Sequence, residues 1–259
     1  REEREFYLKH TRILDEDDHA SRLERVLWDG KTRAARRMLS RVSPTTKQLG
    51  IARIYLMERH PDVDKAIANL PKELLTEAGL IYDRVRWRRR ARKDDRARQL
   101  LFSLPDNLVH PEKWWQEIKY QIRVSLDEGF VTDAYQLAAN NALFENVARA
   151  DASWLAGWIA LRFLNEPDIA YRHFKTMHEI VSMPISRARA AYWAAQASSA
   201  AGDEQLAHRW LQRGVSQPTT FYGQLSSVAL GYDHLNFPAE PQYDMESIKA
   251  FEEQDIAQI

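Results

Sequence analysis

The sequence predicts an all-α protein made of repeated helix pairs, and three observations lead to this prediction. Small residues recur at intervals of 31, 31, 37, 36 and 37 residues, and a turn position precedes each of them by five. Apolar residues between the turns recur at spacings of three and four. No run of alternating apolar and polar residues between Gly or Asn turns favours a β-strand. The small residues are Ala35, Ala66, Ala97, Ala134, Ala170 and Ala207, and the turn positions are Gly30, Pro61, Arg92, Gly129, Asn165 and Gly202.

A repeat of about 34 residues is typical of tetratricopeptide-like arrays, in which each helix pair packs only on its neighbours. The sequence therefore predicts a right-handed superhelical solenoid, with Ala where the two helices of a pair cross closely. We expect this α-superhelical domain to cover residues 1–235, with no internal boundary before about Leu235. Residues 236–259 are expected to begin a linker segment.

Prolines mark where many of the helices begin. Six of them stand just ahead of a periodic segment, where the missing N–H would be unpaired in any case and the fixed φ is already helical. They are Pro44, Pro71, Pro111, Pro167, Pro184 and Pro218. The expected pairs are 18–29 with 32–41, 45–60 with 62–70, 72–91 with 94–103, 111–128 with 131–140, 149–164 with 167–182, and 184–201 with 203–216. A single helix over 219–231 follows.

Composition narrows the classes of function. Thirty-seven basic and 37 acidic residues leave no net charge, which argues against a surface devoted to nucleic acid. The chain has no cysteine, so disulfides, thiolate metal sites and cysteine catalysis are excluded. The longest apolar stretch, residues 154–164, contains Arg162 and is well short of the ~20 residues of a membrane span. The chain opens without an apolar signal region, so any targeting peptide is expected upstream.

The densest charge cluster lies on the expected helix 72–91 and its turn. It consists of Arg84, Arg86, Arg88, Arg89, Arg90, Arg92 and Lys93, interleaved with Trp87. Three interpretations are open: a solvated helix face, a surface for an anionic partner, and a nucleic-acid site. We favour the first, because Trp87 and Ala91 are four residues apart and are expected to face inward while the arginines occupy the other sides.

The eight tryptophans are expected mainly in the core, because most stand at helical spacing beside Leu or Ala. Trp114 and Trp115 are the exception. Adjacent helical positions point about 100° apart, so both side chains cannot face one core. One of the two is therefore expected at a groove or at a seam between repeats, where it is a candidate glycan contact.

The sequence predicts no catalytic site, cofactor site or metal site. It has no nucleophile elbow, phosphate loop or dinucleotide fingerprint, and its glycines are scattered. The run Asp15–Asp18 is interpreted as a helix start, since no calcium-loop pattern follows it. The histidines lack ligand spacing: His173 and His178 are five residues apart, and no His-Glu-x-x-His motif occurs.

Four stretches taken together resemble the helical superhelix of soluble lytic murein transglycosylases. They are Asp18–Gly30, Trp154–Phe163, Pro184–Ala195 and Pro218–Leu225, and they occur in the order found in that family. The resemblance covers about residues 5–235. It implies a periplasmic enzyme in which this superhelix and a short linker form a ring that carries a lysozyme-like catalytic domain. The family cleaves the β-1,4 bond between N-acetylmuramic acid and N-acetylglucosamine, leaving a 1,6-anhydro end, with one Glu as acid and then base.

The chain departs from the family at the catalytic motif, Glu-Ser followed downstream by Gly-Leu-Met-Gln. Glu246-Ser247 is not that motif, because the residues after it contain no Gly and the position still corresponds to the family's linker. The resemblance thus implies an inactive scaffold, expected to be an internal fragment without the catalytic domain. Its expected partners are peptidoglycan glycan strands with their acidic stem peptides, and other cell-wall proteins. The candidate contacts are Arg86, Arg89, Arg90, Trp114 and Trp115. A free-standing tetratricopeptide-like adaptor that binds another protein remains the alternative.

Overall fold

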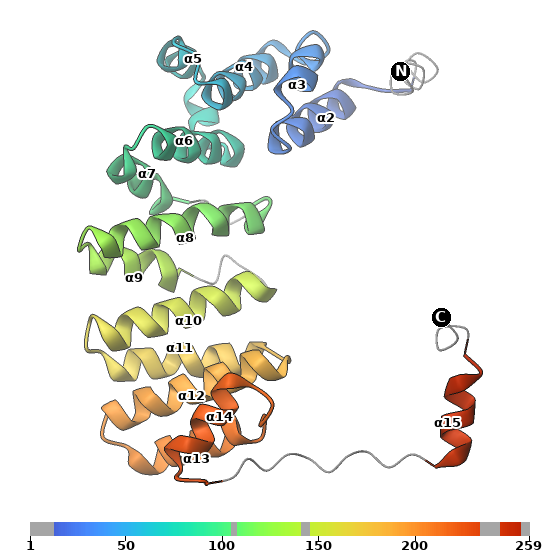
Figure 1. The fold of residues 1–259 in the computed structure, drawn as a ribbon. Helices are drawn as coiled ribbons and strands as arrows, with labels where there is room; N and C mark the ends of the chain where they lie inside the picture. Colours follow the sequence, from blue (N-terminus) through green and yellow to red (C-terminus); the bar gives the residue numbers. More distant parts are fainter. Residues whose placement is uncertain (1–12, 105–107, 141–145, 234–243, 255–259) are drawn as a thin grey trace. The chain divides into compact units, whose positions relative to one another are not determined.

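A computed structural model describes residues 13–104, 108–140, 146–233 and 244–254, and these residues form helices and connecting turns with no β-strand. The chain divides into two compact units, residues 1–180 and 181–259. Figure 1 labels the helices. Those of unit 1 are α2 (Glu16–Trp28), α3 (Thr32–Met38), α4 (Pro44–Glu58), α5 (Val63–Ala68), η1 (Lys72–Thr76), α6 (Ala78–Arg90), α7 (Asp94–Leu101), α8 (Pro111–Asp127), α9 (Val131–Ala139), α10 (Asn146–Arg162) and α11 (Pro167–Ile180).

The turns confirm the repeat register read from the sequence. Five of the six expected turn residues have a positive φ: Gly30 70°, Arg92 54°, Gly129 83°, Asn165 55° and Gly202 84°. A residue in this left-handed region ends a helix and lets the chain reverse into the next one.

The sixth turn differs from the expectation. Its left-handed residue is Arg59 at φ 56°, two positions before Pro61. Proline has its φ fixed near −65° and cannot adopt that conformation, so the reversal falls on the end of α4 instead. The alanines that follow the turns are buried, except Ala66, which is partly buried in the core around α4 and α5.

Helix starts follow local chemistry. The acidic run before α2 forms a capping box, in which the Asp15 carboxylate accepts from the Asp18 amide at 2.9 Å and the Asp18 carboxylate accepts from the Asp15 amide at 3.1 Å. This confirms its assignment as a helix start. The expected helix 72–91 is broken instead: residues 72–76 form a 3-10 turn, and Glu77 is extended at ψ 127°. Helix α6 therefore begins at Ala78.

Within unit 1, the first helix of each pair packs on the first helix of the next. Contacts run from α2 to α4, α4 to α6, α6 to α8 and α8 to α10, and each second helix packs on the first helix of its own pair. The largest core joins side chains of α6, α7, α8, α9 and α10 with Trp28 of α2. Packing in unit 1 thus follows the order of the helices along the chain.

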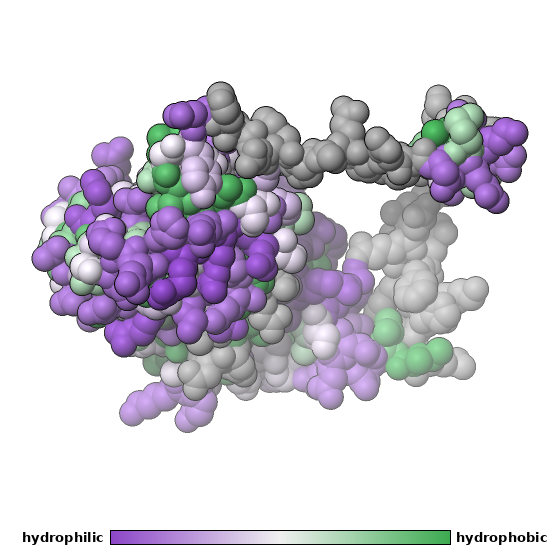
Figure 2. Space-filling view, turned by 90° about the horizontal axis from the view of Figure 1, so that it is seen from below, coloured by the Kyte–Doolittle hydropathy of each residue, from purple (hydrophilic) through white to green (hydrophobic). Residues whose placement is uncertain are grey.

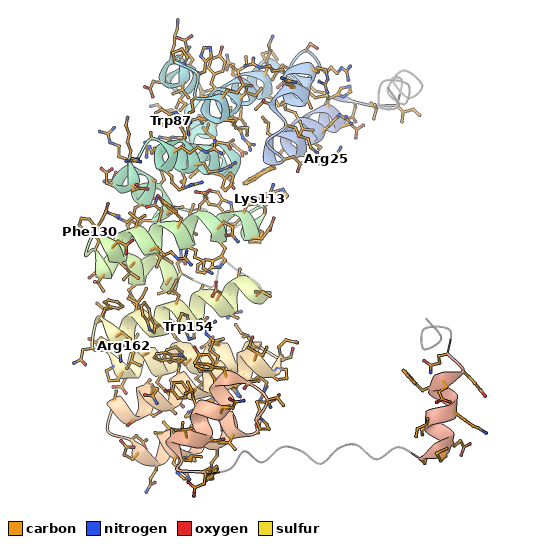
Figure 3. All side chains as sticks on the ribbon, viewed as in Figure 1. Arg25, Trp87, Lys113, Phe130, Trp154 and Arg162 are labelled. Atoms are coloured by element: carbon orange, nitrogen blue, oxygen red, sulfur yellow. The ribbon has the colours of Figure 1, made fainter. Side chains whose placement is uncertain are left out.

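One contact leaves this order. The Lys113 ammonium at the start of α8 donates to the Trp28 carbonyl at the end of α2, at 2.6 Å, across 85 residues of chain. Figure 3 labels Lys113 at this place. The Trp28 ring also lies 4.9 Å from the Tyr82 ring and 6.5 Å from the Trp114 ring. The end of α2 is therefore held by α6 and α8, beyond its nearest neighbours.

Unit 2 contains α12 (Pro184–Ala200), α13 (Glu204–Val215), α14 (Phe221–Ala229) and α15 (Met245–Glu252). The first three pack on one another. The break at 180/181 falls inside the array that the sequence led us to expect over 1–235; it lies where α11 ends and residues 181–183 lead to Pro184. The expected limit at residue 235 lies outside the described residues. The sequence predicts a linker over residues 236–259 and no helix there, whereas the structure has α15 in this segment.

Capping and close packing at the start of α14 explain the residues of the Phe221–Leu225 stretch. Thr220 caps α14, its hydroxyl oxygen accepting from the Gly223 amide at 3.0 Å. A Cβ at Gly223 would lie 2.0 Å from the Gln217 carbonyl oxygen, and one at Gly214 would lie 2.2 Å from the Ser226 Oγ. Glycine is needed at both positions because the start of α14 lies directly against the end of α13.

Candidate functional site

The arginine-rich helix α6 places two of its arginines against a buried carboxylate of α8. Arg89 donates to Glu117 through Nε at 2.6 Å and through Nη2 at 3.1 Å. Arg86 lies on the same carboxylate, with Nε 3.5 Å from Oε1. The Glu117 side chain is only 7% exposed, so its charge depends on these two guanidinium groups for compensation.

Two tyrosine rings complete this clamp. The Arg86 guanidinium lies 5.5 Å from the centre of the Tyr82 ring, and that of Arg89 lies 5.0 Å from the Tyr120 ring. The hydrogen bond to Glu117 raises the pKa of Arg89. Arg86 and Arg89 thus join α6 to α8. This corrects the interpretation of α6 as a solvated arginine face, and it removes these two arginines as free contacts for a glycan strand.

The remaining arginines of α6 are those available to a partner. Arg90 is exposed, and Arg84 and Arg88 are half-buried; none of the three has an ion pair in the described part of the chain, although Arg88 Nη1 donates to the Arg96 carbonyl at 2.7 Å. Burial lowers the pKa of all three, and neighbouring arginines lower those of Arg88 and Arg90 further. Arg84 and Arg88 stand on one side of α6 and repel each other, with Asp95 and Asp64 offsetting part of the repulsion at Arg88. Arg90 stands on another side, near Arg86 and Arg89, where Glu117 offsets part of the repulsion. An anion bound beside Arg84 and Arg88, or beside Arg90, would relieve the rest.

Of the two residues beside these arginines that are expected to face inward, Trp87 does so and Ala91 does not. Trp87 is half-buried against the core around α4 and α5, as expected, with the Lys93 ammonium 5.5 Å from its ring. Ala91 is exposed at the end of α6 and does not face inward. Its position after the last helical residue removes it from the buried stripe of the helix.

Trp114 and Trp115 are both buried, at 0% and 5% exposure. Trp114 packs edge-on against Tyr82, with ring centres 5.2 Å apart. Trp115 lies at the seam between α8 and α10, where its indole N–H donates to the Asp151 carboxylate at 3.2 Å. The expectation that one of them lies at a seam holds for Trp115. Neither ring is open to stack on a sugar, because α8 is covered by α6 on one side and by α10 on the other.

An ion triad that no sequence motif predicts joins α2, α4 and α6; its Arg53 and Asp83 side chains are buried, and its Glu24 side chain is 41% exposed. Arg53 is fully buried, donates through Nε to Asp83 at 2.7 Å, and donates through Nη1 to both Glu24 oxygens at 2.7 Å. Burial would lower the pKa of Arg53, but the charges of Asp83 and Glu24 raise it overall. Burial raises the pKa of Asp83 to about 6 against the effect of Arg53. A Cβ at Gly79 would lie 2.2 Å from Arg53 Nη1, so the guanidinium fits only beside glycine.

These ion pairs share a spacing that the sequence does contain. Arg53 and Asp83 are 30 residues apart, Arg89 and Glu117 are 28 apart, and Arg98 and Glu128 are 30 apart. The Arg53–Asp83 spacing is close to the local repeat of 31 residues, whereas the repeat that contains Arg89 and Arg98 is 37 residues long, so those two pairs join non-equivalent positions of successive helix pairs. An acidic residue 28 to 30 positions after an arginine is the signal that could have identified Glu117 as the partner of the arginine cluster.

The described residues contain no group of three or more His, Cys, Asp or Glu side chains that could hold a metal ion. Figure 3 shows the side chains on the helices.

A small cavity of about 50 Å³ lies between α7, α8 and α9. It is lined by Leu101, Phe102, Leu104, Ile118, Gln136, Leu137 and Asn140. Its volume suits one or two water molecules rather than a substrate. None of the helices in the described ranges has the length and apolar character needed to cross a membrane.

Comparisons of the chain with protein-family models, with curated proteins and with solved structures found no match.

Proposed function

We propose that this chain is the non-catalytic superhelical scaffold of a periplasmic lytic murein transglycosylase. The observation that carries the proposal is the order of the four family-like stretches, Asp18–Gly30, Trp154–Phe163, Pro184–Ala195 and Pro218–Leu225. Each coincides with a helix or a helix start: α2, α10, α12 and the capped start of α14. The packing of successive first helices along unit 1 is compatible with a right-handed solenoid of helix pairs.

The scaffold's part in the reaction is to hold peptidoglycan near a catalytic domain that would cleave the bond between N-acetylmuramic acid and N-acetylglucosamine. In place of Arg86, Arg89, Trp114 and Trp115, the contacts we assign are Arg84 and Arg88 on one side of α6 and Arg90 on another. Their targets are the carboxylates of the stem peptides, because guanidinium groups pair with carboxylates in two-point geometry. Arg86 and Arg89 support this surface by fixing α6 on α8 through Glu117.

The test is attachment of the full chain to purified peptidoglycan sacculi. The variant Arg84→Ala/Arg88→Ala/Arg90→Ala is compared with Arg123→Ala/Arg162→Ala/Arg209→Ala, which removes the same charge at three exposed positions outside α6. Three contacts of about 0.5 kcal/mol each predict a roughly tenfold weaker attachment for the first variant. The difference should shrink as salt rises from 0.05 to about 0.5 M, because screening shortens the reach of each charge.

Equal attachment of the two variants would remove the α6 surface from the proposal. Attachment of neither variant nor the natural chain would oppose a role at peptidoglycan altogether. Circular dichroism of both variants serves as the folding control, since none of the six arginines has an ion pair among the described residues.

The second candidate is an adaptor that binds an acidic protein segment, and it is favoured by the same three arginines, which have no ion pair in the described part of the chain. Sequencing the source gene beyond the codon for Ile259 separates the two. An open frame with Glu-Ser and, further on, Gly-Leu-Met-Gln would support the transglycosylase scaffold. A stop codon there would favour the adaptor.

A further inference from the structure

Helix α14 presents an apolar stripe to solvent. Phe221 is 67% exposed and Val228 is 71% exposed, and the half-buried Leu225 lies between them at helical spacing. The opposite face holds Gly223, Ser226 and Ser227, which are buried against α12 and α13. No charged residue occurs between Pro218 and Tyr232. The exposed face of α14 therefore lacks the charges that keep a surface helix soluble by itself.

This face is unusual for its position, because α14 is the last helix packed on the others of unit 2. Arrays of helix pairs need a terminal helix with a polar outer face, since the last pair otherwise exposes the surface on which a next pair would stack. Figure 2, seen from below, shows hydrophobic side chains at the surface of the packed helices. An apolar helix face of this kind marks a place where another element binds.

Helix α15 has the composition that such a cover needs. Met245, Ile248 and Phe251 recur every three residues and lie within one third of the helix circumference, with exposures of 73%, 38% and 60%. Glu246, Lys249 and Glu253 lie on the other side, whereas Glu252, the last residue of the helix, lies between Met245 and Ile248 around the helix. The helix has its own N-cap, in which Asp244 Oδ1 accepts from the Ser247 amide at 2.7 Å, and it has no buried residue.

We propose that α15 docks on the stripe of α14 and caps unit 2. Its apolar face would cover Phe221, Leu225 and Val228, and its charged face would supply the polar outer surface that α14 lacks. Residues 230–244 connect the two helices and can extend to about 50 Å. A nine-residue helix is about 13 Å long, so either direction of docking is within reach. Because both helices belong to one chain, their contact is intramolecular, and a separate partner would have to compete with it.

Disulfide trapping in the full chain tests the proposal, because the natural sequence has no cysteine. Leu225→Cys/Ile248→Cys joins the middles of the two apolar faces, so it reports docking in either direction. Leu225→Cys/Glu246→Cys is the matched control, with the second cysteine on the charged face of α15. Under mild oxidation at low protein concentration, we expect the first pair to form an intrachain disulfide about tenfold faster, which corresponds to about 1.4 kcal/mol.

Hydrogen exchange provides a measurement without cysteines. Ile248→Asp/Phe251→Asp should speed exchange of the α14 amides and leave those of α12 unchanged, and Glu246→Gln should change neither. Equal disulfide rates for the two pairs, or unchanged α14 exchange, would overturn the proposal. A disulfide that forms mainly between two chains would also overturn it, in favour of a second copy as the cover of α14.

Discussion

The substitution Gly79→Ala tests the ion triad most directly, because two opposing effects act at that position. In a helix interior alanine is a better helix former than glycine by about 1 kcal/mol, and this is the upper limit of the gain at Gly79, the second residue of α6. Here the new Cβ would lie 2.2 Å from Arg53 Nη1 and 2.4 Å from Arg53 Cζ. Arg53 is fully buried and cannot move into solvent without leaving Asp83 and Glu24.

The electrostatic effect is the larger of the two. Breaking a buried ion pair so that one partner is left uncompensated costs about 3–5 kcal/mol. Subtracting the gain in helix propensity leaves a loss of about 2–4 kcal/mol in the free energy of unfolding. For a chain of this size, that loss corresponds to a fall in Tm of about 5–15 °C.

Thermal unfolding followed by circular dichroism measures the effect, with Gly50→Ala in α4 as the control. The Cβ at Gly50 would meet Leu39 Cδ2 at 2.9 Å, and a leucine methyl group can shift where a paired guanidinium cannot. We expect Gly50→Ala to stay within about 1 kcal/mol of the natural chain. In the background Arg53→Leu/Asp83→Leu, Gly79→Ala should no longer destabilise. A Tm for Gly79→Ala equal to or above that of the natural chain would refute the reasoning.

Two further predictions concern the triad and the repeat. The pKa of Asp83 is raised to about 6, so between about pH 4 and pH 6 the folded chain keeps a proton that the unfolded chain has lost. The contribution of Asp83 to stability is therefore present below about pH 4 and declines as pH rises to about 6. Urea unfolding should show the stability of the natural chain falling relative to that of Asp83→Asn over this range. A relative stability that rises from about pH 4 to about pH 6 would contradict the raised pKa of Asp83. Gly202→Val should lower Tm because Gly202 has a φ of 84°, and Ala207→Trp should lower it because Ala207 is 4% exposed at a helix crossing. Unchanged midpoints for both would argue against the repeat register.

The fold was predictable wherever one residue carries a strong conformational preference. Gly30, Gly129, Gly202 and Asn165 adopt a left-handed conformation at low cost, so their spacing revealed the repeat directly. Arg59 adopts the same conformation without any such preference, and the sequence pointed to the nearby proline instead. The break before α6 was missed for a similar reason, since the extended Glu77 is an ordinary helix-forming residue by type.

The candidate site was predictable only in part, because pairing between helices decides what a charged residue does. The cluster on α6 was visible, but Glu117 and not solvent determines the environment of Arg86 and Arg89. Trp114 and Trp115 point about 100° apart, so only one of them could be buried if α8 had a core on one side alone. Helix α8 instead packs between α6 and α10, so two directions around the helix are both buried.

The hydrogen bond from Lys113 to the Trp28 carbonyl has a consequence for how unit 1 folds. In an array with contacts only between neighbours, any pair can form first and growth then proceeds outward from it. Here the end of α2 is completed only when α8, 85 residues later, is in place. Closing so long a stretch of chain is slow and couples the early repeats to the later ones. Unit 1 is therefore expected to fold as one cooperative body, in which a lesion in α8 also loosens the first helix pair.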